Sequence, residues 1–553
     1  ALWKSVSPFP SSPSWSPMSR SSLARSPSPS AFVTLSGVAA RTPDGRTLFD
    51  NLNLSLARER TGIVGRNGTG KTTLLDLIAG DRAPAEGHVA RTGTIARLRQ
   101  DAGAVPGQTV AAVLGVEAAQ ARLARILAGE GTADDMAEAD WTLDARLAEA
   151  LAAVGLDGLS PDREATTLSG GERTRLELAA LELSGAELIL LDEPTNHLDA
   201  DGRAQVAERL SRWPGGAVVV SHDRALLRQM DRIVELSPLG AKIYGGNYDL
   251  YAGRKALERA AADHDLAVAE TEVARTAADA QRRAESKARR DRAGRRKGMK
   301  GDMPKILRDF RAETAENSAG HDARLAVRQA AEAEQALIAA HERVERVRRM
   351  TLPLPSTGLA TGRQVLNLQG ITVDGEEGPR VGPVDLRLTG PERVAITGPN
   401  GSGKTTLLDL ITGRIAPSGG TVECAVPLAL LDQHAGVLRD HETLIEAWQR
   451  LNPDGTLNDA QAALARFLFR NVEAHKRVDT LSGGERLRAA LACVMTGTRP
   501  PLLLVLDEPT NHLDLDAIEA IEAALAAWDG ALVVVSHDRD FLEAIRIERE
   551  VRL

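Results

Sequence analysis

Two glycine-rich segments of the same form constrain the fold of this chain more than any other feature. They read Gly65-Arg66-Asn67-Gly68-Thr69-Gly70-Lys71-Thr72 and Gly398-Pro399-Asn400-Gly401-Ser402-Gly403-Lys404-Thr405. Each lies between a short apolar segment and a leucine-rich run, so each predicts a strand, a phosphate-binding loop and a helix. In such loops backbone N–H groups and the lysine bind phosphate, and the threonine helps hold Mg²⁺. The pair therefore predicts two sites for ATP and Mg²⁺.

The motifs that follow the two phosphate loops recur in the same order, so the chain contains an internal repeat. Lys71 and Lys404 are 333 positions apart, and Gln100 and Gln433 keep the same separation. The Ser-Gly-Gly segments farther along are only 313 positions apart. The first half therefore holds 20 more residues (333 − 313), which we place in a short helical insert at about 116–137.

Three further pairs of motifs carry groups that phosphoryl transfer needs. A Leu-Ser-Gly-Gly-Glu segment begins a helical run at 168–172 and again at 481–485, and such a helix start binds anions. An aliphatic run, typical of a parallel strand buried on both faces, ends in Asp-Glu in each half. Its aspartate would coordinate Mg²⁺, and its glutamate would take a proton from the attacking water. A histidine past the next buried strand would contact the γ-phosphate, although lone histidines are more often structural.

These motifs define the candidate site residues. The predicted catalytic residues are Glu193, Glu508, His222 and His537. The predicted ATP-binding residues are Gly65, Asn67, Gly68, Gly70, Lys71, Thr72, Thr73, Gln100, Ser169, Gly171 and Glu172 in the first half, and Gly398, Asn400, Gly401, Gly403, Lys404, Thr405, Thr406, Gln433, Ser482, Gly484 and Glu485 in the second. The predicted Mg²⁺ ligands are Thr72, Gln100, Asp192, Thr405, Gln433 and Asp507.

The repeated set resembles the ATP-binding cassette superfamily over roughly 32–250 and 365–553. Asn196-His197-Leu198-Asp199 and Asn511-His512-Leu513-Asp514 match that family's D-loop. The resemblance implies that the cassettes pair head to tail within one monomeric chain, each ATP lying between one phosphate loop and the other cassette's Ser-Gly-Gly-Glu segment. The first site would combine Lys71, Thr72, Asp192, Glu193 and His222 with Ser482, Gly484 and Glu485. The second would combine Lys404, Thr405, Asp507, Glu508 and His537 with Ser169, Gly171 and Glu172.

The chain departs from the superfamily pattern where an aromatic ring usually stacks on adenine. The corresponding segments, Val38 to Gly45 and Ile371 to Glu377, contain no aromatic residue. The preference for ATP over GTP therefore stays open.

The segment between the halves, 251–363, predicts two long amphipathic helices that pair as an antiparallel hairpin. Apolar residues recur there at steps of three and four, and Gly294, Gly298, Gly301 and Pro304 are expected to break the helix at the turn. Between 281 and 311, thirteen Lys and Arg outnumber four Asp and Glu, a net charge of +9 in a chain of net charge −8. A basic finger on an acidic body indicates nucleic-acid binding. A solvated coiled-coil spacer is the alternative.

Tandem cassettes with a basic helical linker resemble the ABC-F family. Tyr244-Gly245-Gly246-Asn247-Tyr248-Asp249-Leu250-Tyr251 is similar to that family's entry into its linker. The resemblance implies an ATPase that binds the ribosomal E site, with the linker directed toward the P-site tRNA and the peptidyl transferase centre. Its role would be antibiotic resistance, rescue of stalled ribosomes or routine elongation, and the sequence leaves these open. The rival hypotheses are the ATPase motor of an ABC transporter and a DNA-directed ATPase.

We therefore expect an α/β fold with two P-loop cassette domains joined by a long antiparallel helical hairpin. The expected boundaries are 1–30 for a Ser/Pro-rich disordered leader, with a transit peptide as the alternative, 31–250, 251–363 and 364–553. No apolar run approaches the roughly 20 residues of a membrane span. Two cysteines, Cys424 and Cys493, offer no disulfide framework, which favours a cytoplasmic location.

Overall fold

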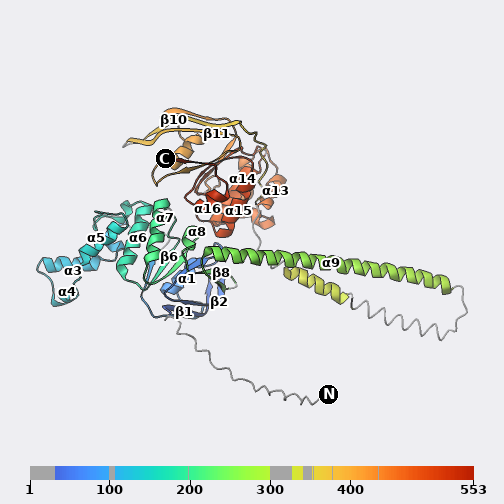
Figure 1. The fold of residues 1–553 in the computed structure, drawn as a ribbon, viewed down its shortest axis with the longest axis horizontal. Coiled ribbons are helices and arrows are strands. Elements are labelled where there is room, and N and C mark those ends of the chain that lie inside the picture. Colours follow the sequence, from blue (N-terminus) through green and yellow to red (C-terminus); the bar gives the residue numbers. More distant parts are fainter. Residues whose placement is uncertain are drawn as a thin grey trace, which may run out of the picture.

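Two α/β cassettes joined by a long helical linker make up the fold (Figure 1). The structure, a computed structural model, describes residues 31–98, 106–196, 198–238, 240–298, 325, 327–340, 352, 354–375, 378–433, 435–497 and 499–553. The predicted fold class is confirmed.

The first cassette is built on two sheets. A three-stranded antiparallel sheet has the order β2 (Thr47–Leu56), β1 (Val33–Arg41) and β4 (Glu86–Arg91). The larger sheet has the order β5 (Ile95–Leu98), β6 (Leu188–Asp192), β7 (Gly216–Val220), β3 (Arg60–Val64), β8 (Arg232–Ser237) and β9 (Gly240–Gly245), parallel except for β9. Every residue of β6 and β7 is buried, as the aliphatic runs predict for central parallel strands.

The helices of this cassette surround the larger sheet and form the insert. They are α1 (Lys71–Ala79), α2 (Val110–Val113), α3 (Glu117–Leu127), α4 (Ala133–Ala137), α5 (Leu143–Ala153), α6 (Gly170–Ser184), α7 (Ala200–Arg212) and α8 (Arg224–Leu227). The predicted insert at 116–137 contains α3 and α4, which project from the cassette in Figure 1. Leu127 and Met136 there are 81% and 58% exposed, so the insert presents apolar side chains to solvent.

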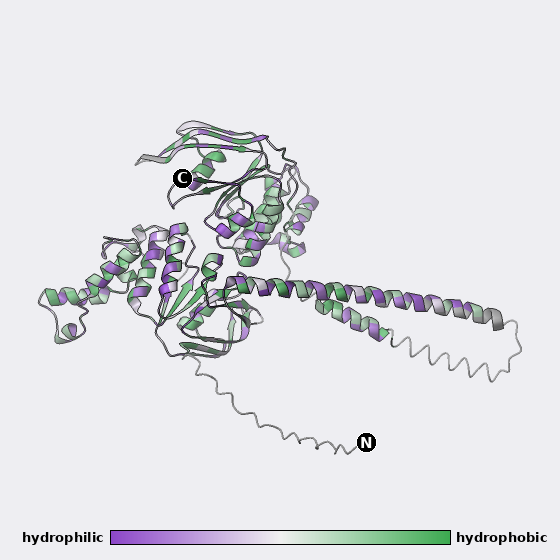
Figure 2. Ribbon diagram, viewed as in Figure 1, coloured by the Kyte–Doolittle hydropathy of each residue, from purple (hydrophilic) through white to green (hydrophobic). Residues whose placement is uncertain are grey.

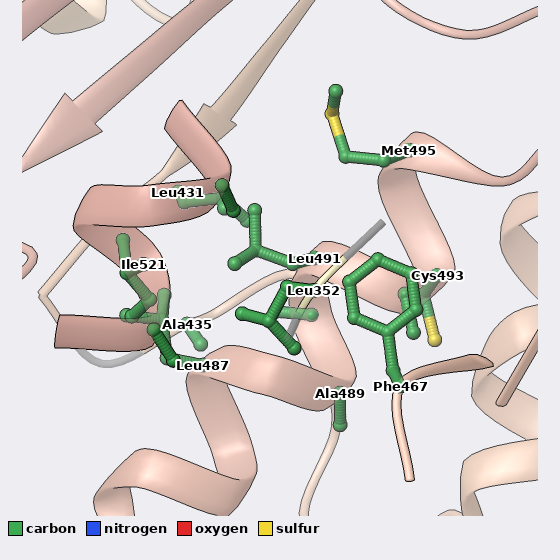
Figure 3. Packing of buried hydrophobic residues seen from close by; sticks show 14 of the residues in the cluster. Leu352, Leu431, Ala435, Phe467, Leu487, Ala489, Leu491, Cys493, Met495 and Ile521 are labelled. Atoms are coloured by element: carbon green, nitrogen blue, oxygen red, sulfur yellow. The ribbon is translucent and has the colours of Figure 1, made fainter. Parts of the chain in front are cut away.

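The second cassette repeats this plan. Its antiparallel sheet has the order β11 (Gly378–Thr389), β10 (Gln364–Gly375) and β13 (Gly419–Cys424), and its parallel sheet the order β14 (Leu428–Leu431), β15 (Leu503–Asp507), β16 (Ala531–Val535), β12 (Arg393–Thr397) and β17 (Arg549–Arg552). Its helices are α11 (Lys404–Ile411), α12 (Leu444–Leu451), α13 (Leu457–Arg466), α14 (Gly483–Met495), α15 (Leu515–Ala527) and α16 (Arg539–Ala544). In its core Phe467 packs near Cys493, and Leu352 anchors the end of the linker there (Figure 3).

The linker begins with α9 (Tyr248–Gly298), a single helix of 51 residues. Helical residues 327–340 run beside it, where Ala333 and Ala340 are buried (Figure 1). The helix continues through Gly294, where the sequence predicted a break, because one glycine costs a helix only about 1 kcal/mol. The rest of the predicted turn, 299–324, lies outside the described residues, as does 1–30.

Hydrophilic and hydrophobic residues alternate along α9 in Figure 2. Among the described residues, the helices include none with the length and apolar character needed to cross a bilayer.

Candidate active sites

The first phosphate loop connects β3 to α1. A Cβ at Gly65 would lie 2.5 Å from the Leu236 carbonyl oxygen, so only glycine fits there. Gly70 caps α1 in the left-handed conformation (φ 92°) and supplies no side-chain cap, which leaves the first-turn N–H groups available to an anion. Lys71 Nζ donates to the Gly65 oxygen at 2.7 Å and lies 2.9 Å from His222 Nε2. This is the strand, loop and helix geometry that the sequence predicted.

The second phosphate loop has the same shape between β12 and α11. Gly403 caps α11 with φ 90° and again supplies no side-chain cap. Lys404 Nζ donates to the carbonyl oxygens of Gly398 and Pro399, both at 2.8 Å. His537 Nε2 has no hydrogen-bond partner among the described residues, whereas His222 Nε2 lies beside Lys71, so the two lysines are held differently.

Glu193 and Glu508 follow β6 and β15 in an uncommon backbone conformation. Their φ angles are 50° and 44°, in the left-handed region that costs a residue with a Cβ about 1 kcal/mol. His222 donates its backbone N–H to Glu193 Oε2 at 3.3 Å, and His222 Nε2 is 3.4 Å from Glu193 Oε1. Burial raises the pKa of Glu193 to about 8 and that of Glu508 to about 7. Each carboxyl is thus a base whose pKa lies near neutral pH, as an acceptor of a water proton requires.

Both histidines are held neutral. Burial, with Lys71 nearby, lowers the pKa of His222 well below its usual range, and burial lowers the pKa of His537 to about 4. A neutral imidazole can donate one N–H to a phosphate oxygen without adding charge.

The residues predicted to hold Mg²⁺ fit that ion. Burial raises the pKa of Asp192, to which Thr72 donates a hydrogen bond. Its Oδ2 is buried without a hydrogen-bond partner among the described residues, and Arg97 Nη2 lies 3.9 Å away. Thr405 Oγ1 donates to Asp507 Oδ2 at 3.1 Å. One carboxylate and one hydroxyl, with the remaining positions left to water and phosphate, are typical of Mg²⁺ sites.

The two Ser-Gly-Gly-Glu segments form capping boxes. Ser169 caps α6 and Ser482 caps α14, and in each the glutamate three residues on returns a hydrogen bond to the serine backbone N–H. Glu172 and Glu485 are therefore engaged with their own serines, at 2.8 and 3.0 Å from the serine nitrogens. The serines and glycines, rather than the glutamates, remain available to an anion.

The cassettes meet through their D-loops. Asn67 donates from its backbone to Asp514 Oδ2 at 3.0 Å and from its side chain to the His512 oxygen at 2.9 Å. Asn400 donates from its backbone to Asp199 Oδ2 at 3.1 Å. Each phosphate loop therefore contacts the opposite D-loop, an arrangement compatible with the head-to-tail pairing that the family resemblance implies.

The first cavity, of about 500 Å³, contains residues of both cassettes. Its lining includes Asn67, Gly68, Gly70, Lys71, Thr72, Thr73, Asp192, Glu193 and His222 with Ser482 and Gly483. The second cavity, of about 330 Å³, is lined by Asn400, Gly401, Gly403, Lys404, Thr405, Thr406, Gln433, Asp507, Glu508 and His537 with Leu198 and Arg203. Ser169, Gly171 and Glu172 are not among its lining residues, so the part of the first cassette that the structure describes contributes to the second cavity from its D-loop side. Gln100 lies outside the described residues.

No Phe, Tyr or Trp occurs among the described residues that line the first cavity. Thr42, Arg46 and Leu48 line it, and Arg46 Nη2 donates to the Gly68 oxygen at 3.3 Å. The base of a nucleotide would therefore meet aliphatic and guanidinium groups there.

The root of the linker is connected to the first site through one carboxylate. Asp516, at the start of α15, accepts from Arg66 of the first phosphate loop and from Arg259 of α9, both at 3.1 Å. Arg259 also donates to Glu519 at 2.8 Å. No sequence motif identifies Arg66, Arg259 and Asp516 as connected, because contacts between distant segments leave no local pattern.

A family model described as "ABC transporter" matches residues 49–196 and 381–511. The tylosin resistance ATP-binding protein TlrC of Streptomyces fradiae is 34% identical over 546 residues, which cover 93% of this chain and 95% of TlrC. The ATP-binding protein Uup of Caulobacter vibrioides is 33% identical over 94% of this chain and 77% of Uup. ABC transporter F family member 2 of Arabidopsis thaliana is 29% identical over 93% of this chain and 76% of that protein.

Among solved structures, the archaeal ribosome recycling factor aABCE1, in complex with ribosomal stalk protein aP1, matches with a TM-score of 0.58 and 19% identity. The match covers 93% of this chain and 87% of that one, and it is a likeness of fold.

The fold, the paired sites and the relatives together show that this chain is a tandem-cassette ATPase that binds and hydrolyses ATP. The chain belongs to the ATP-binding cassette family, within its ABC-F group.

Proposed function

We propose that this ATPase works on the ribosome, where ATP-driven closure of the cassettes directs the basic linker toward ribosomal RNA and tRNA. The observation that carries the proposal is the shared Asp516, which joins the first phosphate loop to the linker helix through Arg66 and Arg259. A movement of α15 when nucleotide binds would therefore be transmitted to α9. The charge of +9 between 281 and 311 suits a polyanion.

In the proposed reaction each phosphate loop holds the phosphates of one ATP through its backbone N–H groups and its lysine. The Asp192–Thr72 and Asp507–Thr405 pairs would hold Mg²⁺, which supplies positive charge to the β- and γ-phosphates. Glu193 and Glu508 accept the proton of the attacking water, while the neutral His222 and His537 donate to γ-phosphate oxygens. Ser482 would bind the first γ-phosphate from the opposite cassette, and Ser169 the second, once the second site closes further.

Glu193→Gln together with Glu508→Gln should trap the closed form, because ATP still binds but water is no longer activated. We expect this double variant to cosediment with ribosomes in ATP more strongly than the unsubstituted chain does. Equal sedimentation of the two proteins would contradict the proposal. Copurification of a membrane-spanning subunit in place of ribosomes would favour a transporter motor.

The linker should provide the RNA contact. Replacing Lys297, Lys300 and Lys305 with Gln should weaken rRNA binding and lower the slope of log K against log salt by about 2, given roughly 0.7 per lost phosphate contact on single strands. A matched control replaces three exposed cations of the cassettes, Arg212, Arg439 and Arg477, which are 77%, 59% and 57% exposed. An unchanged slope in the linker variant would favour the spacer hypothesis.

The likeness to TlrC suggests the role. We propose that the chain protects ribosomes from an antibiotic, and tylosin is the first compound to test because TlrC's name specifies resistance to it. Expression in a susceptible bacterium should raise the inhibitory concentration of tylosin, and the Glu193→Gln, Glu508→Gln variant should not. No rise for the unsubstituted chain would leave stalled-ribosome rescue or elongation as the role.

A further inference from the structure

The helices that follow the two D-loops differ at one position that faces the ATP sites. Asp199 and Asp514, which contact the opposite phosphate loops, are the N-caps of α7 and α15. Four residues after each aspartate, the first cassette has Arg203 and the second has Ile518. The internal repeat thus places a cation on one side of the molecule and an apolar side chain on the other.

Arg203 lies in the second ATP site, although it belongs to the first cassette. It lines the second cavity together with Lys404, Glu508 and His537. Its Nε donates to the Leu198 oxygen at 3.2 Å, which fixes the guanidinium against the D-loop, and its side chain is only 16% exposed. It also borders the first cavity, where Nη1 pairs with Asp223 at 3.5 Å.

Glu508 needs such a cation more than Glu193 does. Both carboxylate oxygens of Glu508 are buried without a hydrogen-bond partner among the described residues, and His537 Nε2 is 3.5 Å from Oε1. Glu193, in contrast, accepts a hydrogen bond from the His222 backbone. In the second cavity Arg203 is a cation from the opposite cassette on the same lining as Glu508, whereas the first cavity has Ile518 at the corresponding position.

We propose that Arg203 is a positioning residue that the first cassette contributes to the second ATP site, where its charge holds the Glu508 carboxylate for the attacking water. Ile518, which is 2% exposed and lines the first cavity, supplies no charge there. The two ATP sites are then chemically inequivalent, although every motif residue is present in both. The inference rests on ATP hydrolysis alone and is independent of the ribosome.

The test measures each site separately in the full-length chain. Glu193→Gln leaves turnover to the second site, and Glu508→Gln leaves it to the first. In the Glu193→Gln protein, Arg203→Ile should lower kcat roughly tenfold with KM for ATP changed less than about twofold, the pattern of a lost transition-state interaction. Arg203→Lys should recover about half of the lost rate, because it restores the charge without the fixed geometry.

The same substitution in the Glu508→Gln protein should lower kcat less than about twofold, because a residue that acts through Glu508 has no effect once that carboxylate is gone. The matched control is Arg212→Ile, which removes an exposed arginine from the same helix. Melting curves check that each variant is folded. Equal losses of kcat in both backgrounds, an effect on KM alone, or no recovery with lysine would overturn the proposal and leave Arg203 as an interface residue.

Discussion

The two ATP sites share their motifs, yet they are joined to different parts of the molecule. The first phosphate loop is held by two hydrogen bonds from Asn67 to the opposite D-loop and is linked through Asp516 to α9. The second contacts the opposite D-loop in a similar way, with the Asn400 backbone N–H donating to Asp199, but Pro399 stands where the first has Arg66 and has no charged side chain for an ion pair. The first phosphate loop thus has a connection to the linker, through Arg66 and Asp516, that the second phosphate loop lacks at the corresponding position. Identical motifs therefore do not make the two sites equivalent.

The largest effect is expected when the two catalytic glutamates are replaced one at a time. Glu193→Gln and Glu508→Gln should each lower turnover at their own site roughly 100-fold, because a general base contributes about 10²- to 10⁴-fold. Only Glu193→Gln should change the ratio of ribosome-stimulated hydrolysis to basal hydrolysis. Steady-state assays with and without ribosomes measure both rates, and identical ratios for the two variants would remove the distinction.

The acid limb of the pH–rate profile should separate the sites by about one pH unit. A base works when ionised, so kcat/KM rises as pH passes through the pKa of the free enzyme. With pKa values of about 8 for Glu193 and about 7 for Glu508, the Glu508→Gln protein should lose activity at higher pH than the Glu193→Gln protein. At a pH below both pKa values, the second site should keep a fraction of its maximal rate that is roughly tenfold larger than the fraction kept by the first site. Coincident limbs would show that the two carboxyls have equivalent surroundings.

A smaller effect is expected from the linker root. Arg259→Ala removes the contacts to Asp516 and Glu519, which are only partly exposed, so it should lower ribosome-stimulated hydrolysis roughly three- to fivefold at about 1 kcal/mol of lost coupling. Basal hydrolysis should change little, because Arg259 does not line the first cavity. Arg254→Ala, an exposed arginine on the same helix, is the control. If both variants hydrolyse ATP alike with and without ribosomes, Arg259 does not couple the first site to the linker.

The smallest prediction concerns stability. Burial raises the pKa of Glu177 in α6 to about 7, whereas the corresponding position of α14 is the buried Ala490. A raised carboxyl pKa means that the folded state holds its proton longer, so the first cassette loses stability as pH rises from about 4.5 to 7. Glu177→Gln should therefore raise the melting temperature by roughly 2–4 °C at pH 8 and little at pH 5. Calorimetry at both pH values checks this, and a gain that is the same at pH 5 would contradict it.

Much of the architecture could be predicted from the sequence because it depends on local pattern. Glycine spacing, buried aliphatic runs and helix caps fix the phosphate loops, β6, β15, α6 and α14 within a few residues. Glu172 and Glu485 were predicted to bind ATP, whereas their capping boxes already follow from the Ser-x-x-Glu spacing.

The remaining features depend on contacts across the cassette interface. The internal repeat identifies positions where the two halves agree, whereas Arg203 stands where they differ, so the repeat does not predict its role. Asp516 was overlooked because its partners are 450 and 257 positions away in sequence. The helix α9 extends beyond the predicted break at Gly294 because a single glycine costs a helix only about 1 kcal/mol.

The unbroken α9 acts mechanically as a rigid rod. Its 51 residues span roughly 76 Å at 1.5 Å per residue. Ion pairs of Asp249, Lys255 and Arg259 attach it to the cassettes near one end. The helix beyond Arg259 is roughly 59 Å long, so a tilt of about 5° there would move its far end through roughly 5 Å. A small movement at the ATP site, too small to repack the core of a cassette, could thus become a larger movement at the far end of α9.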